Sequence, residues 1–218
     1  MKKKIVALCL VVALAATAII GGTLAYFTDN DAKTNTFTVG NVDITLTEPN
    51  WVASGSSDAP EVYPGEALAK DPTVTNVGAN PCFVRVKVQM PTGWENKITT
   101  ESGNNYNNGN TIGANWVLKD GYYYYTKPLC VRGTESDTWN AGLTSVTTPL
   151  FDRVRITTAL TNNVTETDDG KTYEYTGDFN IIVTAQAVQA QGAKPSWSNV
   201  KTMTVDEIAA WFTTCGLT

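Results

Sequence analysis

Residues 82–90 read CFVRVKVQM, and they alternate apolar and polar side chains more regularly than any other stretch of the 218-residue chain. Successive side chains of a β-strand point to opposite faces, so this pattern predicts a strand with one face in a core. The expected inward side chains are Cys82, Val84, Val86, Val88 and Met90. The expected outward side chains are Phe83, Arg85, Lys87 and Gln89.

The same two-residue period recurs along the chain. The other segments that show it are residues 36–47, 116–119, 122–125, 151–158 and 179–188. The alternation shifts by one residue at Gly40, which predicts a bulge or a bend there. Further along, Asp120-Gly121 supplies the positive φ of a tight hairpin turn. Residues 179–188 are apolar enough on both faces to predict a central strand.

The segments between these strands complete the expected fold. Residues 95–115 are polar and rich in Asn and Gly, so they predict a surface insertion. Residues 204–212 predict a short helix capped by Thr204 or Asp206. We therefore expect an all-β chain, with one antiparallel β-sandwich over residues 37–218 and a short C-terminal helix. The residues alone leave jelly-roll and immunoglobulin-like strand orders open.

The first 25 residues follow the order of a secretory signal peptide. Residues 2–4 are lysines, residues 5–20 are almost all apolar, and small residues follow up to Ala25. A membrane anchor is the alternative, but this apolar run is shorter than the roughly 17–25 residues that span a bilayer. We expect cleavage between Ala25 and Tyr26, secretion, and membrane attachment only through an uncleaved signal segment.

Charge and the absence of histidine narrow the function classes. Residues 1–25 hold three lysines and no acidic side chain, so the remaining chain carries 13 basic and 21 acidic side chains, a net charge of −8. Nucleic acid is not expected as a partner, because this chain repels phosphate and lacks a basic cluster. No histidine is present, which excludes imidazole bases and the common zinc-protease motifs. We expect no catalytic residues, metal ligands or cofactor.

Three cysteines follow the signal segment, at Cys82, Cys130 and Cys215. Their spacing fits no metal-binding motif. An odd number allows one disulfide with a free thiol, or three buried thiols. If a disulfide forms, Cys82 and Cys130 are the expected partners, because both lie beside predicted strands whereas Cys215 lies near the C-terminus.

Several stretches resemble the TasA/camelysin family of exported Gram-positive proteins, which are processed by a SipW-type signal peptidase. The most specific are GGTLAYFTD at residues 21–29, followed by TFTVGNVDITL at residues 36–46, and KDPTVTN at residues 70–76. The other similar stretches, in matching order, are residues 63–65, 84–88, 120–125 and 185–190. The resemblance therefore extends over most of the chain.

This resemblance implies a jelly-roll subunit of cell-surface or biofilm-matrix fibres. Such subunits assemble by giving an N-terminal strand to the next copy. Here the donor would be residues 26–36, in which Tyr26, Phe27 and Ala32 stand among polar residues, with Tyr26 or Phe27 entering a pocket of the neighbour. The alternatives are a camelysin-like cell-surface metalloprotease, which would have to hold zinc without imidazole, and a monomeric surface binding module. The long insertion and the cysteines depart from the best-known fibre former.

Overall fold

The computed structural model describes residues 41–56, 64–92, 97–103, 110–158 and 180–217. The expected signal peptide (residues 1–25), its cleavage site at Ala25 and Tyr26, the donor residues Phe27 and Ala32, and the bend at Gly40 lie outside these residues.

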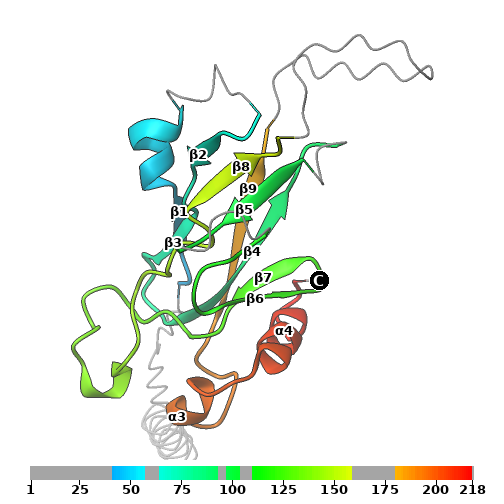
Figure 1. The fold of residues 1–218 in the computed structure, drawn as a ribbon. Coiled ribbons are helices and arrows are strands. Elements are labelled where there is room, and N and C mark those ends of the chain that lie inside the picture. Colours follow the sequence, from blue (N-terminus) through cyan, green and yellow to red (C-terminus); the bar gives the residue numbers. More distant parts are fainter. Residues whose placement is uncertain (1–40, 57–63, 93–96, 104–109, 159–179, 218) are drawn as a thin grey trace, which may run out of the picture. The chain divides into compact units, whose positions relative to one another are not determined.

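Nine strands form three antiparallel sheets in the described part of the chain (Figure 1). Their bounds are β1 Ile44–Thr47, β2 Ala67–Ala69, β3 Thr73–Asn76, β4 Cys82–Gln89, β5 Ile98–Glu101, β6 Trp116–Lys119, β7 Tyr122–Tyr125, β8 Arg153–Ile156 and β9 Ile182–Gln189. The sheet orders are β6-β7-β4-β9, β2-β8-β5 and β1-β3. The predicted all-β class with antiparallel sheets is confirmed.

The strand predicted at residues 82–90 is confirmed as β4, which is an inner strand of the largest described sheet. β4 pairs with β9 over eight residues, from Cys82 opposite Gln189 to Gln89 opposite Ile182. Its other edge pairs with β7, which is joined to β6 by the predicted hairpin. Asp120 and Gly121 have φ values of 51° and 79°, as the tight turn requires.

The inward side chains of all three sheets meet in one core. Val84 and Val86 of β4 are fully buried there, together with Leu68 of β2, Val74 of β3 and Val154 of β8. Apolar residues at alternate positions thus hold the sheets together, because burying them removes apolar surface from water.

In the described residues, four short helical segments accompany the sheets: η1 Trp51–Gly55, η3 Thr138–Asn140, α3 Trp197–Val200 and α4 Val205–Thr214. The predicted C-terminal helix is confirmed as α4, and Thr204 caps it by accepting a hydrogen bond from the Glu207 backbone N–H. In the described residues, no helix combines the length and apolarity needed to cross a membrane.

The outer face of the four-stranded sheet is covered around Phe83 and Arg85. Both point away from the main core, as expected, yet both are buried. Ile208 and Phe212 of α4 pack over Phe83, and the Arg85 guanidinium lies 4.7 Å from the centre of the Phe212 ring and 3.9 Å from that of Tyr122. α4 therefore forms a cover that the alternating pattern of β4 does not reveal.

Two further expectations differ from the structure. Within residues 95–115, expected as a surface insertion, Ile98–Glu101 is strand β5, and Ile98 is only 1% exposed. β9, expected as a central strand, lies at an edge of its described sheet. The apolar side chains on both faces of β9 are typical of a strand with a neighbour on each side. Among the described strands, however, only β4 pairs with β9.

Candidate functional site: an uncovered edge between β1 and β9

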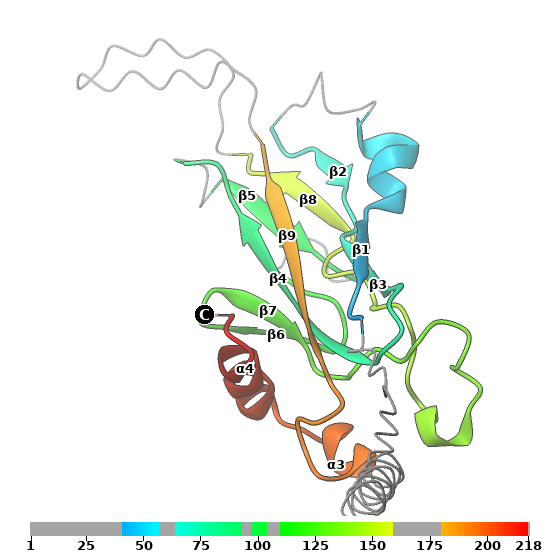
Figure 2. The ribbon, with the colours of Figure 1, turned by 180° about the vertical axis from the view of Figure 1, so that it is seen from behind.

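β1 and β9 lie side by side and run in opposite directions (Figure 2). The end of β1 and the start of β9 border one groove, because Leu46 and Thr47 line it together with Ile181 and Val183. Among the described strands, β1 pairs only with β3, and β9 only with β4. The facing edges of β1 and β9 therefore present backbone N–H and C=O groups that no described strand pairs.

The inward side chains along this edge are less well covered than the rest of the core. Val84 and Val86 of β4 are 0% exposed. Their partners across the pair, Ala187 and Ala185 of β9, point to the same core but are only half-buried. Within the described residues, the core is thus covered less completely at β9 than at β4, one strand away.

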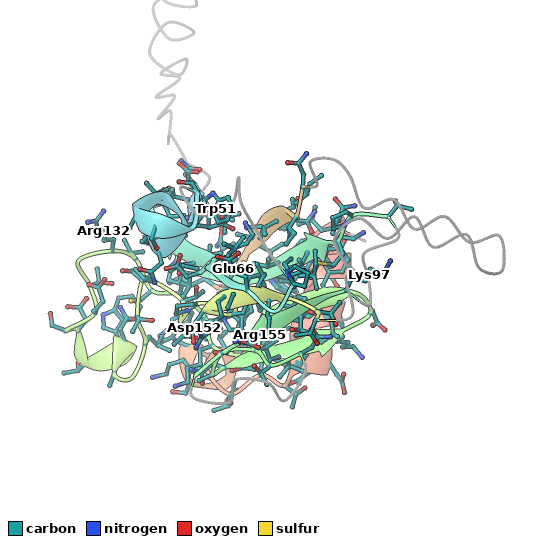
Figure 3. The ribbon with its side chains drawn as sticks, turned by 45° about the horizontal axis from the view of Figure 1, so that its top comes forward. Trp51, Glu66, Lys97, Arg132, Asp152 and Arg155 are labelled. Carbon is teal, nitrogen blue, oxygen red and sulfur yellow. The ribbon has the colours of Figure 1, made fainter. Side chains whose placement is uncertain are left out.

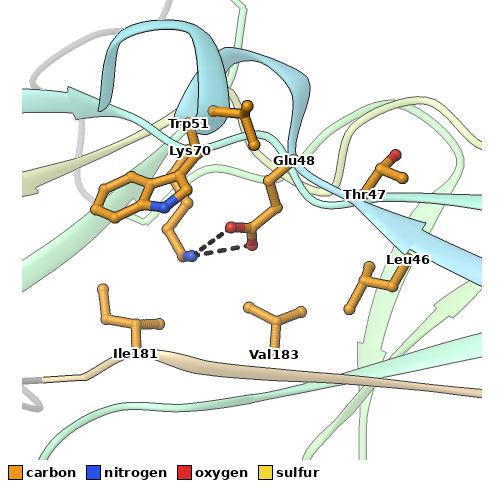
Figure 4. Close-up of a pocket in the computed structure, with 8 residues that line it drawn as sticks. Leu46, Thr47, Glu48, Trp51, Lys70, Ile181 and Val183 are labelled. Carbon is orange, nitrogen blue, oxygen red and sulfur yellow. Dashed lines mark hydrogen bonds and ion pairs between the residues drawn. The ribbon is translucent and has the colours of Figure 1, made fainter. Parts of the chain in front are cut away.

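The groove at this edge has a volume of about 470 Å³, apolar walls and one ion pair (Figure 4). Leu46, Ile181 and Val183 form part of its wall. Lys70 Nζ donates to both carboxylate oxygens of Glu48, at 2.8 and 2.9 Å, and lies 5.0 Å from the centre of the Trp51 ring. The ion pair is internally satisfied, but Glu48 retains 18% side-chain exposure and further accepting capacity.

Local contacts hold the polar side of the groove in place. The carboxylate of Asp71, which is buried, accepts a hydrogen bond of 2.8 Å from the Asn50 backbone N–H at the start of η1. At the other end of η1, Gly55 lies against the backbone of β2, where a Cβ atom would come within 2.2 Å of the Ala69 carbonyl oxygen. Only glycine permits this approach, which places η1 against β2, with the Trp51 ring beside Lys70.

A second charged cluster lies around β8 and is structural (Figure 3). Glu101, 1% exposed, accepts from Arg155 Nε at 2.7 Å and forms an ion pair with Arg153. Arg155 also donates to the Gly65 carbonyl oxygen, and the Gly103 backbone N–H donates to the carboxylate of Asp152. These contacts join β5, β8 and the segment before β2, and the buried carboxylate is held between arginines rather than beside a second acid.

The cysteines show no reactive or metal-binding arrangement in the residues described. Cys82 and Cys130 are buried free thiols, and Cys215 is exposed. Burial, with a smaller effect of Cys130, raises the pKa of Cys82 to about 12, so this thiol stays protonated at neutral pH. Cys82 pairs with Leu129, the residue before Cys130, so the two cysteines are neighbours in the fold. No group of three or more Cys, Asp or Glu side chains there could hold a metal ion.

The groove combines residues that sequence reasoning did not connect. Glu48, Trp51, Lys70 and Ile181 lie up to 133 positions apart, so no spacing motif could reveal them. Two signals did exist in the sequence. Lys70 begins one of the stretches that resemble the TasA/camelysin family, and the strand after Ile181 is apolar on both faces.

Comparison with protein-family models identifies the family of this chain. A sequence model described as camelysin metallo-endopeptidase matches residues 1–122, more than half of the chain. The matched part contains the predicted signal and donor segments, β1 and Lys70, and it ends before β9. A search among curated proteins found no match. On the family match, the chain belongs to the camelysin family.

Proposed function

We propose that this protein is an exported, non-enzymatic subunit of cell-surface or biofilm-matrix fibres, and that its β1–β9 edge accepts the N-terminal strand of another copy. The observation that carries the proposal is the half-buried inward face of β9 beside fully buried β4. An added strand would cover Ala185 and Ala187 and satisfy the open backbone groups, which is the basis of β-strand addition. A contact that passes from copy to copy without closing produces a filament.

The proposed strand would come from residues 26–36, released by cleavage after Ala25 by a SipW-type peptidase. This segment is too polar to form a core strand by itself, but backbone pairing does not depend on side-chain polarity. β1 also contacts β9 directly, so a donor that fills the whole edge has to displace β1 along part of its length. The fold itself would be a jelly-roll sandwich, with residues 37–218 as the domain.

The alternative of a metalloprotease is disfavoured by the donor groups of this chain. The chain has no histidine, and the Cys82 thiol is protonated and buried. Three of the described carboxylates already bind cationic side chains: Glu48 binds Lys70, Glu101 binds arginines, and Glu207 binds Lys194. Carboxylates alone suit calcium or magnesium better than catalytic zinc. The residues present therefore do not fit the metal that the family name implies.

Removal of the donor segment tests the proposal. Mature protein starting at Tyr26 should form filaments on concentration, or on mild acidification that reduces the repulsion of its net charge. A chain starting at Asn35 should stay monomeric by light scattering and give the same circular dichroism spectrum. Equal polymerisation of both chains would exclude donation by residues 26–34. A mature chain that stays monomeric would favour the surface binding module.

Processing and proteolysis provide separate tests. The intact mass of the secreted protein should correspond to a start at Tyr26, and retention of Lys2–Lys4 in the culture would indicate a membrane anchor instead. Purified mature protein should not cleave casein or a peptide library, with or without added zinc. Metal-dependent cleavage that persists through repurification would exclude the non-enzymatic role.

A further inference from the structure

The parity of the donor segment determines which of its side chains face the core of an accepting subunit. Alternate residues of a strand point to opposite faces, so residues 26–36 divide into two sets. The neutral set is Tyr26, Thr28, Asn30, Ala32, Thr34 and Thr36. The charged set is Phe27, Asp29, Asp31, Lys33 and Asn35. Burial of an unpaired charge costs far more than burial of a neutral polar group, so the neutral set faces the core.

We propose that Tyr26 of one copy fills the β1–β9 groove of the next copy, and that Phe27 faces solvent. This inference rests on the strand donation proposed above. A tyrosine ring suits the apolar wall of Leu46, Ile181 and Val183, and the groove is large enough for an aromatic side chain.

The polar side of the groove also distinguishes tyrosine from phenylalanine. Glu48 faces the groove with 18% of its side chain exposed, and its carboxylate has accepting capacity beyond the two bonds from Lys70 (Figure 4). A phenol hydroxyl donates a hydrogen bond to such a carboxylate, whereas a phenylalanine ring has no donor for its remaining accepting capacity. The groove therefore suits tyrosine, which has an apolar ring and a polar hydroxyl. The alternation of the donor strand independently places Tyr26 on the inward face.

Placement of Tyr26 in the groove also sets the direction of the donor. The groove lies where β1 ends and β9 begins. A donor that starts there must run along β9 toward Gln189, which makes it antiparallel to β1. By pairing with β1, the donor strand would extend the antiparallel β3-β1 pair by one strand. Ala32 comes about 20 Å further on, level with the end of β9, where the inward side chain is the small Ala187.

Alanine substitutions at two adjacent residues test the inference. Each mature chain is produced with its start at position 26, so that signal cleavage is not a variable. The Tyr26→Ala chain should need about tenfold more protein to polymerise, since it loses one buried aromatic side chain. The Phe27→Ala chain is the matched control and should change this concentration less than about twofold. Tyr26→Phe should give an intermediate, several-fold increase, and Glu48→Gln should weaken assembly similarly.

The outcomes separate this inference from the proposed function. If Phe27→Ala weakens assembly as much as Tyr26→Ala, or if neither does, the assignment of Tyr26 is wrong, while loss of assembly in the chain starting at Asn35 would still support strand donation. If the chain starting at Asn35 assembles normally, or the full mature chain never assembles, both proposals fail.

Discussion

The two faces of β9 differ in their cover, although both belong to one strand. On the outer face, Val188 packs with Phe83 beneath α4 and is buried. On the inner face, Ala185 and Ala187 point toward the main core but are only half-buried. A helix from the same chain closes one face, and no described element closes the edge of the other. Among the described elements, the C-terminal helix α4 covers the outer face, and the inner edge of β9 is the place where we propose that a further strand adds.

The largest expected effect concerns the closed face. Phe212→Ala removes a fully buried ring that makes an edge-to-face contact with Tyr124 at 5.7 Å between ring centres. It should lower the free energy of unfolding by about 3–5 kcal/mol in urea titration. Val183→Ala, on the open edge, should cost about 1 kcal/mol in the monomer, because less buried surface is lost. Equal costs would contradict the difference between the two faces.

Arg85 gives a sharper test of how α4 is attached. Its Nε donates to Gln186 at 2.7 Å, and its planar guanidinium lies between the Tyr122 and Phe212 rings. Arg85→Lys keeps the charge but loses the planar stack, so it should cost about 2 kcal/mol of unfolding free energy. Lys87→Arg, two residues along β4 at an exposed position, is the control and should change stability by less than about 0.5 kcal/mol. Equal effects would contradict the assigned role of Arg85.

The thiols should show the smallest effect. In native protein, iodoacetamide at neutral pH should modify Cys215 and leave Cys82 unmodified, because burial keeps the Cys82 thiol protonated. The disulfide predicted from sequence remains a prediction, since all three cysteines are free in the structure. If oxidised protein contains a link, non-reducing peptide mapping should find it between Cys82 and Cys130. A Cys82–Cys215 link, or rapid modification of native Cys82, would contradict these expectations.

Local patterns predicted the parts of the fold that depend on local chemistry. The alternation of β4, the Asp120-Gly121 turn and the Thr204 cap each lie within a few residues, so they were readable from the sequence. β5 was missed because its polar residues are buried by distant partners: Glu101 is neutralised by Arg155, 54 positions away. Periodicity cannot show such a pair.

The groove was unpredictable for a similar reason, because its two walls come from opposite ends of the domain. Leu46 and Glu48 precede β2, whereas Val183 belongs to the last strand and Ile181 lies directly before it. The apolar character of β9 on both faces was visible in the sequence, but it was interpreted as a central position in the subunit's own sheet. The structure places β9 at an edge of its described sheet, so its apolar residues do not indicate a central position in that sheet.

Amide hydrogen exchange in monomeric and assembled mature protein tests the central claim most directly. The sheet containing β9 has a second edge strand, β6 (Trp116–Lys119), which serves as an internal control. If the N-terminal strand of another copy fills the β1–β9 edge, amides of β9 and β1 should exchange more slowly in filaments, because their open backbone groups become paired. The amides of β6 should be unchanged. Protection of β6 without protection of β9 would contradict the account.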